Sequence, residues 1–171
     1  MLKEPILNKL NDQIALEGYS AYLYYAMVGY FETINLKGFA NWMLIQAQEE
    51  ITHMQRIFTY VNDRGAAVRL QAMDQPPATW DSPLAVVTET LAHEQMISEK
   101  INECVTLAIQ ENDHSTNAML QWFVSEQVEE EANADDLLQK LIMIGDNASG
   151  LFLMDADLAK RTFVFELPES V

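Results

Sequence analysis

The sequence predicts an all-α protein: a four-helix bundle with a long crossover between the second and third helices and a short fifth helix near the C-terminus. Three observations predict this fold. Gly and Pro are scarce, with 6 and 5 residues among 171. Residues that favour turns gather in four places, at 34–38, 63–83, 111–115 and 145–150. The long segments between them carry apolar residues three and four positions apart, which turns one face of each helix toward a shared core.

Residues that start and stop helices mark the ends of these segments. We expect helices over residues 5–33, 38–64, 83–111, 115–144 and 150–160, within one domain over 1–171. The markers are Pro5 in a first turn, Ser82 and Pro83 as N-cap and N1, Asp113 or Ser115 as an N-cap, and Gly65 and Gly145 just after C-terminal ends.

The lengths of the connections predict how the helices are arranged. The breaks near 35 and 112 are only a few residues long, so each joins two antiparallel neighbours. The middle connection has roughly 17 residues and could extend about 55 Å at about 3.3 Å per residue. That length is enough to return along the whole bundle, so we expect the third helix to run parallel to the second.

The formal net charge of −16 limits the partners of the protein. Nucleic acid and anionic membranes would be repelled, whereas cations would be attracted. Cys104 is the single cysteine, the N-terminal residues lack the apolar run of a signal peptide, and no run of about 18 apolar residues could span a membrane. We therefore expect a protein of the reducing cytoplasm.

Ionisable side chains interrupt the apolar stripe near the middle of each long helix. They are Glu17 in the first helix, Glu50 and His53 in the second, Glu94 in the third and Glu130 in the fourth. The third stripe is expected to contain Leu84, Val87, Leu91, Glu94, Ser98, Ile101, Val105 and Ala108. The sequence therefore predicts a polar layer across the middle of the bundle, unless the stripes are misphased and the acids are simply solvated.

The polar residues of the second helix pair repeat those of the first. Three pairs are each 77 residues apart: Glu17 and Glu94, Glu50 and Gln127, and His53 and Glu130. The breaks near 35 and 112 have the same separation, so the layer residues of each helix pair should meet at one depth.

Four buried carboxylates would repel one another and raise their own pKa values unless cations compensate them. No Lys or Arg interrupts a stripe, so internal ion pairs are a poor explanation. Two divalent cations would balance the four charges, and a ligand set of carboxylates with one imidazole suits iron or manganese. Glu50 and His53, three positions apart on one helix face, can ligate the same ion.

Several neighbouring residues have both a structural and a functional interpretation. Tyr24, seven residues after Glu17 on the same face, is either a core aromatic or a residue that supports the metal centre as an electron donor. Glu49, Glu126 and Glu129 either belong to solvated helix faces or form a third, looser cation site beside the layer. We expect Glu131 to be solvated, His93 and His114 not to be ligands, and the nine methionines to fill the core rather than bind haem.

Three stretches resemble the bacterial non-haem ferritins: "QAQEEITHMQR", "HEQMISEKINE" and "LQWFVSEQVEEE". The resemblance implies a ferritin-like bundle with a ferroxidase centre. One iron would be held by Glu17, Glu50 and His53, and a second by Glu50, Glu94 and Glu130, with Gln127 close by. Glu49, Glu126 and Glu129 match the third iron site of the family, Tyr24 its neighbour of the centre, and Trp122 a further shared position. The family assembles 24 subunits into a hollow shell that stores ferric oxide.

The resulting hypothesis is oxidation of Fe(II) by O2 or hydrogen peroxide and storage of the ferric product. Haem-containing bacterioferritin is disfavoured, because it expects a second Glu-x-x-His and a Met after the metal-binding Glu, where this chain has Gln127-x-x-Glu130 and Ile51. A peroxide-handling bundle of the rubrerythrin type expects a set of cysteines that is absent here. A metal-free structural bundle is the remaining alternative. Gly18, inside a helix, and the apolar tail "TFVFELPESV" depart from the family pattern.

Overall fold

The computed structural model describes residues 2–164, and these form five helices without a β-strand. The helices are α1 (Glu4–Thr33), α2 (Lys37–Asp63), α3 (Pro83–Gln110), α4 (His114–Ile144) and α5 (Ala148–Leu158). Their ends differ from the predicted ranges by two residues at most, the largest difference being at α5. Within the described range, no helix combines the length and apolar character needed to cross a membrane.

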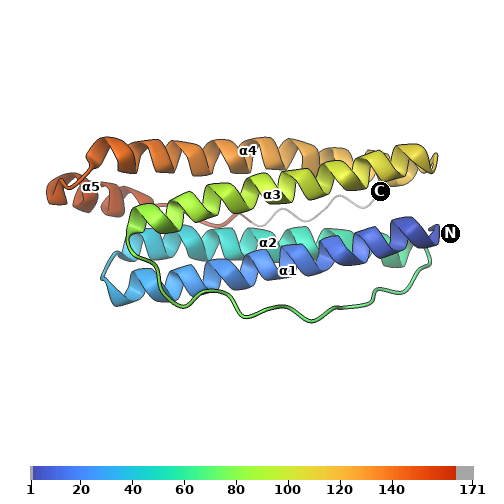
Figure 1. Ribbon diagram of the computed structural model, residues 1–171, viewed down its shortest axis with the longest axis horizontal. Helices are drawn as coiled ribbons and strands as arrows, with labels where there is room; N and C mark the ends of the chain where they lie inside the picture. The colour runs from blue at the N-terminus through green and yellow to red at the C-terminus, as the bar shows by residue number, and fades with distance from the viewer. Residues whose placement is uncertain (1, 165–171) are drawn as a thin grey trace.

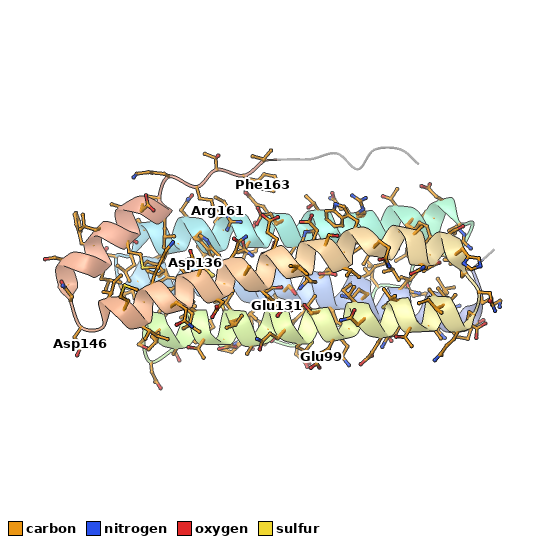
Figure 2. The ribbon with its side chains drawn as sticks, turned by 90° about the horizontal axis from the view of Figure 1, so that it is seen from above. Glu99, Glu131, Asp136, Asp146, Arg161 and Phe163 are labelled. Atoms are coloured by element: carbon orange, nitrogen blue, oxygen red, sulfur yellow. The ribbon has the colours of Figure 1, made fainter. Side chains whose placement is uncertain are left out.

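The four long helices form two antiparallel pairs, α1 with α2 and α3 with α4 (Figure 1). The connection between α2 and α3 runs past α1 from one end of the bundle to the other, and α3 therefore points in the same direction as α2 (Figure 1). After α5 the chain turns back and runs beside α2 (Figure 2). The predicted fold class, including the crossover and the short fifth helix, is confirmed.

The helix ends are capped as the residue types require. Ser82 Oγ accepts a hydrogen bond from the Ala85 amide at 3.1 Å. The Asp113 carboxylate accepts one from the Thr116 amide, also at 3.1 Å, so Asp113 rather than Ser115 is the N-cap of α4. Gly65 and Gly145 follow the ends of α2 and α4 with positive φ angles of 70° and 53°.

The N-terminus of α2 is capped by α5 and not by its own flanking residue. Asp155 Oδ1 accepts hydrogen bonds from the amides of Gly38 at 2.8 Å and Phe39 at 3.0 Å. A Cβ atom on Gly38 would lie only 1.7 Å from the Asp155 carbonyl oxygen, so this close approach requires glycine. The contact fixes α5 against α2 and determines where the chain beyond α5 returns.

Hydrogen bonds hold the crossover against α1, and a glycine in that helix leaves space for a side chain of the crossover. Asn11 Oδ1 accepts from the Arg69 amide at 2.8 Å, and Gln71 Nε2 donates to Asp12 at 2.6 Å. A Cβ atom on Gly18 would lie 3.2 Å from Met73 Sδ and 3.3 Å from Met54 Sδ. The unexpected glycine inside α1 therefore leaves room for a crossover methionine.

A polar layer divides the core into two apolar clusters. One cluster contains Tyr24, Phe31, Phe39, Met43 and Leu137, and the other contains Ile6, Leu10, Ile57, Ile101 and Phe123. Glu17, Glu50, His53, Glu94, Gln127 and Glu130 lie between them in the chain and are all buried. The prediction that these acids are buried is correct, so the solvated alternative is wrong.

The predicted stripe of α3 is wrong in part. Leu84 at its start is 41% exposed, and Leu91, Ser98 and Val105 are only half-buried. The buried residues of this helix also include Thr90, His93, Ile97 and Cys104. The reason is that α3 packs against both α1 and α4, so its buried face is wider than one stripe of three- and four-residue spacing and lies in a different direction.

Candidate metal centre

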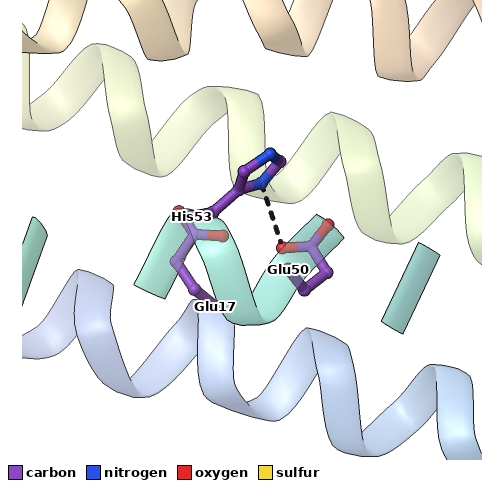
Figure 3. Close-up of side chains that lie close together, drawn as sticks. All are labelled: Glu17, Glu50 and His53. Atoms are coloured by element: carbon purple, nitrogen blue, oxygen red, sulfur yellow. Dashed lines mark ion pairs between the residues drawn. The ribbon is translucent and has the colours of Figure 1, made fainter. Parts of the chain in front are cut away.

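Glu17, Glu50 and His53 converge in the middle of the bundle. Each offers one ligand atom, and the three atoms lie within 4.8 Å of one another. Figure 3 shows Glu17 reaching from α1 toward Glu50 and His53, which lie one turn apart on α2. All three side chains are buried, with at most 3% of their surface exposed. No other group of three or more such residues with this geometry occurs within residues 2–164.

These three residues carry buried polar atoms that nothing in the protein satisfies. Glu17 Oε2, Glu50 Oε2 and His53 Nδ1 are buried without a hydrogen-bond partner, and they are the only such side-chain atoms in the described chain. His53 Nδ1 and Glu50 Oε2 are 3.4 Å apart, but their geometry does not make a hydrogen bond (Figure 3). Burying unsatisfied acceptors is unfavourable. A cation that accepts lone pairs from all three atoms would remove that penalty, so the residues present fit a metal ion.

The electrostatics of the trio agree with this assignment. Burial raises the pKa of Glu17 well above its ordinary value, and the nearby Glu50 carboxylate raises it further. Burial likewise raises the pKa of Glu50, followed by repulsion from Glu94 and Glu130. The Glu50 carboxylate therefore interacts electrostatically with acids of α3 and α4 as well as with those of α1 and α2. A divalent cation would favour the ionised form of both carboxylates.

Glu94 lies in the same layer and is surrounded by neutral hydrogen-bond donors. The Tyr24 hydroxyl donates to its Oε1 atom, and Gln127 Nε2 donates to its Oε2 atom at 3.0 Å. Burial and the Glu130 carboxylate raise the pKa of Glu94 to about 7, although both hydrogen bonds lower it. Burial and the Glu94 carboxylate in turn raise the pKa of Tyr24 well above its ordinary value.

Three glutamine amides each donate a hydrogen bond to a carboxylate of the layer. Gln13 donates to Glu17 Oε1 at 2.9 Å, Gln127 to Glu94 Oε2 at 3.0 Å, and Gln46 to Glu130 Oε2 at 2.7 Å. Each amide orients a carboxylate without neutralising its charge. On Glu17 the arrangement leaves Oε2 free to face the neighbouring ligands, since Oε1 is held by Gln13.

The three acids of the predicted third site do not converge in the same manner. Glu49 is half-buried, and its carboxylate forms an ion pair with Arg161 NH2 at 2.7 Å. Burial raises the pKa of Glu49 to about 7, and the Arg161 guanidinium opposes that shift. Burial lowers the pKa of the Arg56 guanidinium, and the charge of Glu126 opposes that shift. Glu129 is exposed. Within residues 2–164, the oxygens of these three acids do not come within 4.8 Å of one another as the ligand atoms of Glu17, Glu50 and His53 do.

The remaining residues singled out in the sequence have structural partners. His93 is buried, and its Nε2 atom lies 2.8 Å from Ser20 Oγ; burial lowers its pKa to about 4. His114 is exposed at the first residue of α4. Trp122 packs edge-on against His53, with ring centroids 5.4 Å apart. Glu131 was expected to be solvated but accepts a hydrogen bond from Ser98 of α3, because both residues lie where α3 and α4 meet.

Three residues near the site were not identified from the sequence: Gln13, Gln46 and Arg161. Gln13 had a detectable signal, because it precedes Glu17 by one helical turn and shares its face. Arg161 had none, because it lies 112 positions from Glu49, beyond the fifth helix. The apolar tail at 162–171 falls largely outside the described residues.

Comparisons with known proteins agree over nearly the whole chain. A family model described as ferritin-like domain matches residues 7–144. A probable bacterial non-heme ferritin-like protein from Haemophilus influenzae is 39% identical over 158 residues, covering 92% of this chain and 96% of the relative. A bacterial non-heme ferritin from Staphylococcus aureus is 37% identical over 163 residues, covering 95% and 98%.

Solved structures give the same result at higher identity. An engineered closed form of the ferritin from Archaeoglobus fulgidus superposes with a TM-score of 0.95 at 46% identity, covering 96% of this chain and all of that one. The open-pore ferritin from the same archaeon superposes with a TM-score of 0.94 at 46% identity, covering 95% of this chain.

Proposed function

Because the chain belongs to the ferritin-like family, we propose that it stores iron, oxidising Fe(II) at the buried polar layer and retaining the ferric product. The observation that carries the proposal is the set of three unsatisfied buried atoms on Glu17, Glu50 and His53. A metal-free structural bundle would have no reason to keep them, because apolar residues of similar size would be more favourable there.

In this proposal Fe(II) is the substrate and the layer provides two adjacent positions for it. Glu17, Glu50 and His53 would hold one ion, and Glu50, Glu94 and Glu130 the other. The bridging role of Glu50 is supported by its position, since its carboxylate is influenced by both Glu94 and Glu130. The raised pKa values mean that carboxyl groups release protons when a cation binds, so uptake should acidify the solution.

The electron balance requires two ions at once. Each Fe(II) gives up one electron, and the pair of electrons reduces O2 with two protons to hydrogen peroxide, or hydrogen peroxide with two protons to two water molecules. Holding both ions beside one carboxylate lets a two-electron oxidant meet both donors together. The carboxylates offset the added positive charge as both ions become Fe(III).

The two positions should hold iron with unequal strength. The first has an imidazole and two oxygens without other partners. In the second, Glu94 already accepts from Tyr24 and Gln127, and Glu130 accepts from Gln46, so an ion must compete with existing hydrogen bonds. The weaker position suits iron that moves on to storage. Glu49, with Glu126 and Glu129, is the proposed third iron site, which would bind iron as it leaves the second position. Tyr24 is the proposed supporting residue of the centre.

Storage in bulk implies an assembly around a cavity. The Archaeoglobus fulgidus relative is described as a ferritin with an open pore, of which a closed form was engineered. We extend that architecture to this chain as a homo-oligomeric cage, expected to contain 24 subunits and to work in the cytoplasm. Size-exclusion chromatography with light scattering measures the assembly directly, and a monomer or dimer at micromolar concentration would contradict it.

The test of the centre is aerobic addition of Fe(II) to the metal-free protein, followed by absorbance of the ferric product. The double variant Glu50→Ala with His53→Ala removes the shared carboxylate and the imidazole. We expect its initial oxidation rate to fall at least about tenfold, since it loses ligands of both ions. The matched control is Glu99→Ala with His114→Ala, two exposed residues of the same types. Equal rates for the two double variants would show that the site assignment is wrong.

A further inference from the structure

Arg161 brings a positive charge to the edge of the polar layer from outside the bundle. It lies three residues beyond the end of α5, in the segment that turns back beside α2 (Figure 2). Asn41 Nδ2 donates to the carbonyl oxygens of Leu158 at 3.2 Å and Arg161 at 3.0 Å, which holds this segment in place. The guanidinium carbon lies 5.0 Å from the centre of the Trp42 ring. The position of Arg161 is therefore set by backbone and ring contacts as well as by charge.

The guanidinium makes two polar contacts that point toward the layer. NH2 donates to Glu49 Oε2 at 2.7 Å, and NH1 donates to Gln46 Oε1 at 2.6 Å. Gln46 uses its other amide atom, Nε2, to donate to Glu130 Oε2 at 2.7 Å. An unbroken chain of hydrogen bonds thus connects the segment after α5 to a carboxylate of the second iron position.

Orientation of the Gln46 amide depends on this contact. A side-chain amide can turn its oxygen and nitrogen to either side. With Arg161 donating to the oxygen, the nitrogen must face Glu130. Without the guanidinium, only the Glu130 carboxylate would hold the amide in this orientation, and a cation beside Glu130 could then attract the Gln46 oxygen.

The ion pair with Glu49 is accessible to solvent. The Arg161 and Glu49 side chains are 25% and 26% exposed, so a hydrated ion can reach the carboxylate without unfolding of the bundle. A divalent cation and a guanidinium cannot occupy the same Oε2 atom at hydrogen-bond distance. A cation on either oxygen of the Glu49 carboxylate would also lie close to the guanidinium, so the two positive charges repel and each weakens binding of the other.

We propose that Arg161 is a tethered competitor for cations at Glu49 and, through Gln46, a positioning residue for Glu130. This inference rests on the proposed function, because it concerns iron that leaves the second position. A cation arriving at Glu49 displaces the guanidinium, releases the segment after α5 and frees Gln46. By reciprocity, docking of Arg161 weakens cation binding at Glu49 by the same factor as the cation weakens docking.

The test uses Zn2+, which does not change oxidation state, and isothermal titration calorimetry of the assembled metal-free protein. We expect two tight steps per subunit and a weaker third step. Arg161→Met should tighten the third step about tenfold, within the usual range of coupling between sites. Arg161→Lys, which keeps the charge, should stay within about twofold of the parent protein. Glu49→Gln, added to Arg161→Met, should abolish the gain.

Lys160→Met is the matched control. Lys160 is the adjacent residue, carries the same charge and pairs with Asp157 at the surface, 75% exposed. Its removal changes the net charge equally but breaks no contact with the layer, so the third step should stay within about twofold of the parent. An equal gain in Lys160→Met and Arg161→Met would overturn the proposal, because it would show a general charge effect. An unchanged third step in Arg161→Met, or no third step in any variant, would also overturn it.

Hydrogen exchange of the segment provides a second readout that a loss of folding would not imitate. In the parent protein, Zn2+ at concentrations that fill the third step should speed amide exchange across residues 159–164, while exchange in α2 stays slow. In Glu49→Gln the same addition should have no effect on 159–164. Unchanged exchange in the parent would refute displacement of Arg161. Failure of the proposed function is distinguishable, because it would remove the two tight steps, which Glu50→Ala with His53→Ala tests separately.

Discussion

The metal-free protein should lose stability as the pH rises from 5 to 8, which is the reverse of the usual behaviour of acidic groups that are paired in the fold. Glu94 has a folded pKa of about 7 against an ordinary value of 4.5. A carboxyl whose pKa is raised by folding contributes stability that is fully present below the unfolded pKa and is lost as the pH rises through the folded pKa. The pKa shifts of Glu17 and Glu50 have the same direction.

The magnitude follows from Glu94. A difference between 4.5 and about 7 corresponds to about 3 kcal/mol of unfolding free energy at about 1.4 kcal/mol per pH unit. Most of this loss should occur between about pH 5 and pH 7.5. Saturating Zn2+ should reverse the slope, because the ion binds the ionised carboxylates and competes with protons for them.

Urea denaturation in the presence of a chelator, followed by circular dichroism at several pH values, measures this slope. Glu94→Gln should flatten it by about 3 kcal/mol, because glutamine has a similar shape and no titrating group. Glu99→Gln is the control on the same helix, with an exposed side chain that Figure 2 shows at the surface, and its slope should match the parent. His93, whose pKa burial lowers to about 4, acts in the opposite direction below about pH 6.5, so the comparison with Glu94→Gln is decisive: an equal slope in Glu94→Gln and the parent would refute the reasoning about the buried layer.

Three further contacts near the site can be tested by substitution, two of them with a matched control. Gly38→Ala should destabilise the protein by about 2 kcal/mol in urea denaturation, because its Cβ would lie 1.7 Å from a backbone carbonyl oxygen. Gly18→Ala is the control and should change stability by less than about 1 kcal/mol, because its Cβ would meet flexible methionine side chains, the nearer at 3.2 Å. Tyr24→Phe removes the donor to Glu94 and should cost about 1–2 kcal/mol by the same measurement, and the exposed Tyr22→Phe should cost nothing measurable. Asn11→Ala should speed amide exchange at the start of the crossover and cost about 1 kcal/mol; unchanged exchange would show that this hydrogen bond does not hold the crossover.

The fold was predictable because its signals are local. Helix ends depend on residues such as Ser82 and Gly65, whose effects extend over one turn. The crossover is long enough to let α3 run parallel to α2. The buried face of α3 was harder to predict. Its direction depends on where α1 and α4 lie around it, and the exposed Leu84 shows that apolar spacing within one helix does not contain that information.

The residues of the candidate site also fall into two groups, those placed by local sequence and those placed by tertiary packing. Glu50 and His53 are one turn apart, and helical geometry places them together with no knowledge of the tertiary structure. The burial of Glu17, Glu94 and Glu130 followed from the apolar residues around each of them. The position of Arg161 depends instead on the packing of α5 against Gly38, a contact across 117 residues that no spacing rule describes.

The polar partners of the layer explain why a cation is the natural complement of this core. Gln13, Gln46 and Gln127 satisfy single oxygens of Glu17, Glu130 and Glu94 but supply no charge. Had arginines occupied those three positions, internal ion pairs would have filled the site and excluded metal. The Arg161 guanidinium comes from outside the bundle and, among the described residues, contacts Gln46 of the second helix and the half-exposed Glu49. Amides inside the bundle orient the carboxyl groups without supplying a counter-charge, so their charge is balanced by protons in the metal-free protein and, in the proposed function, by iron.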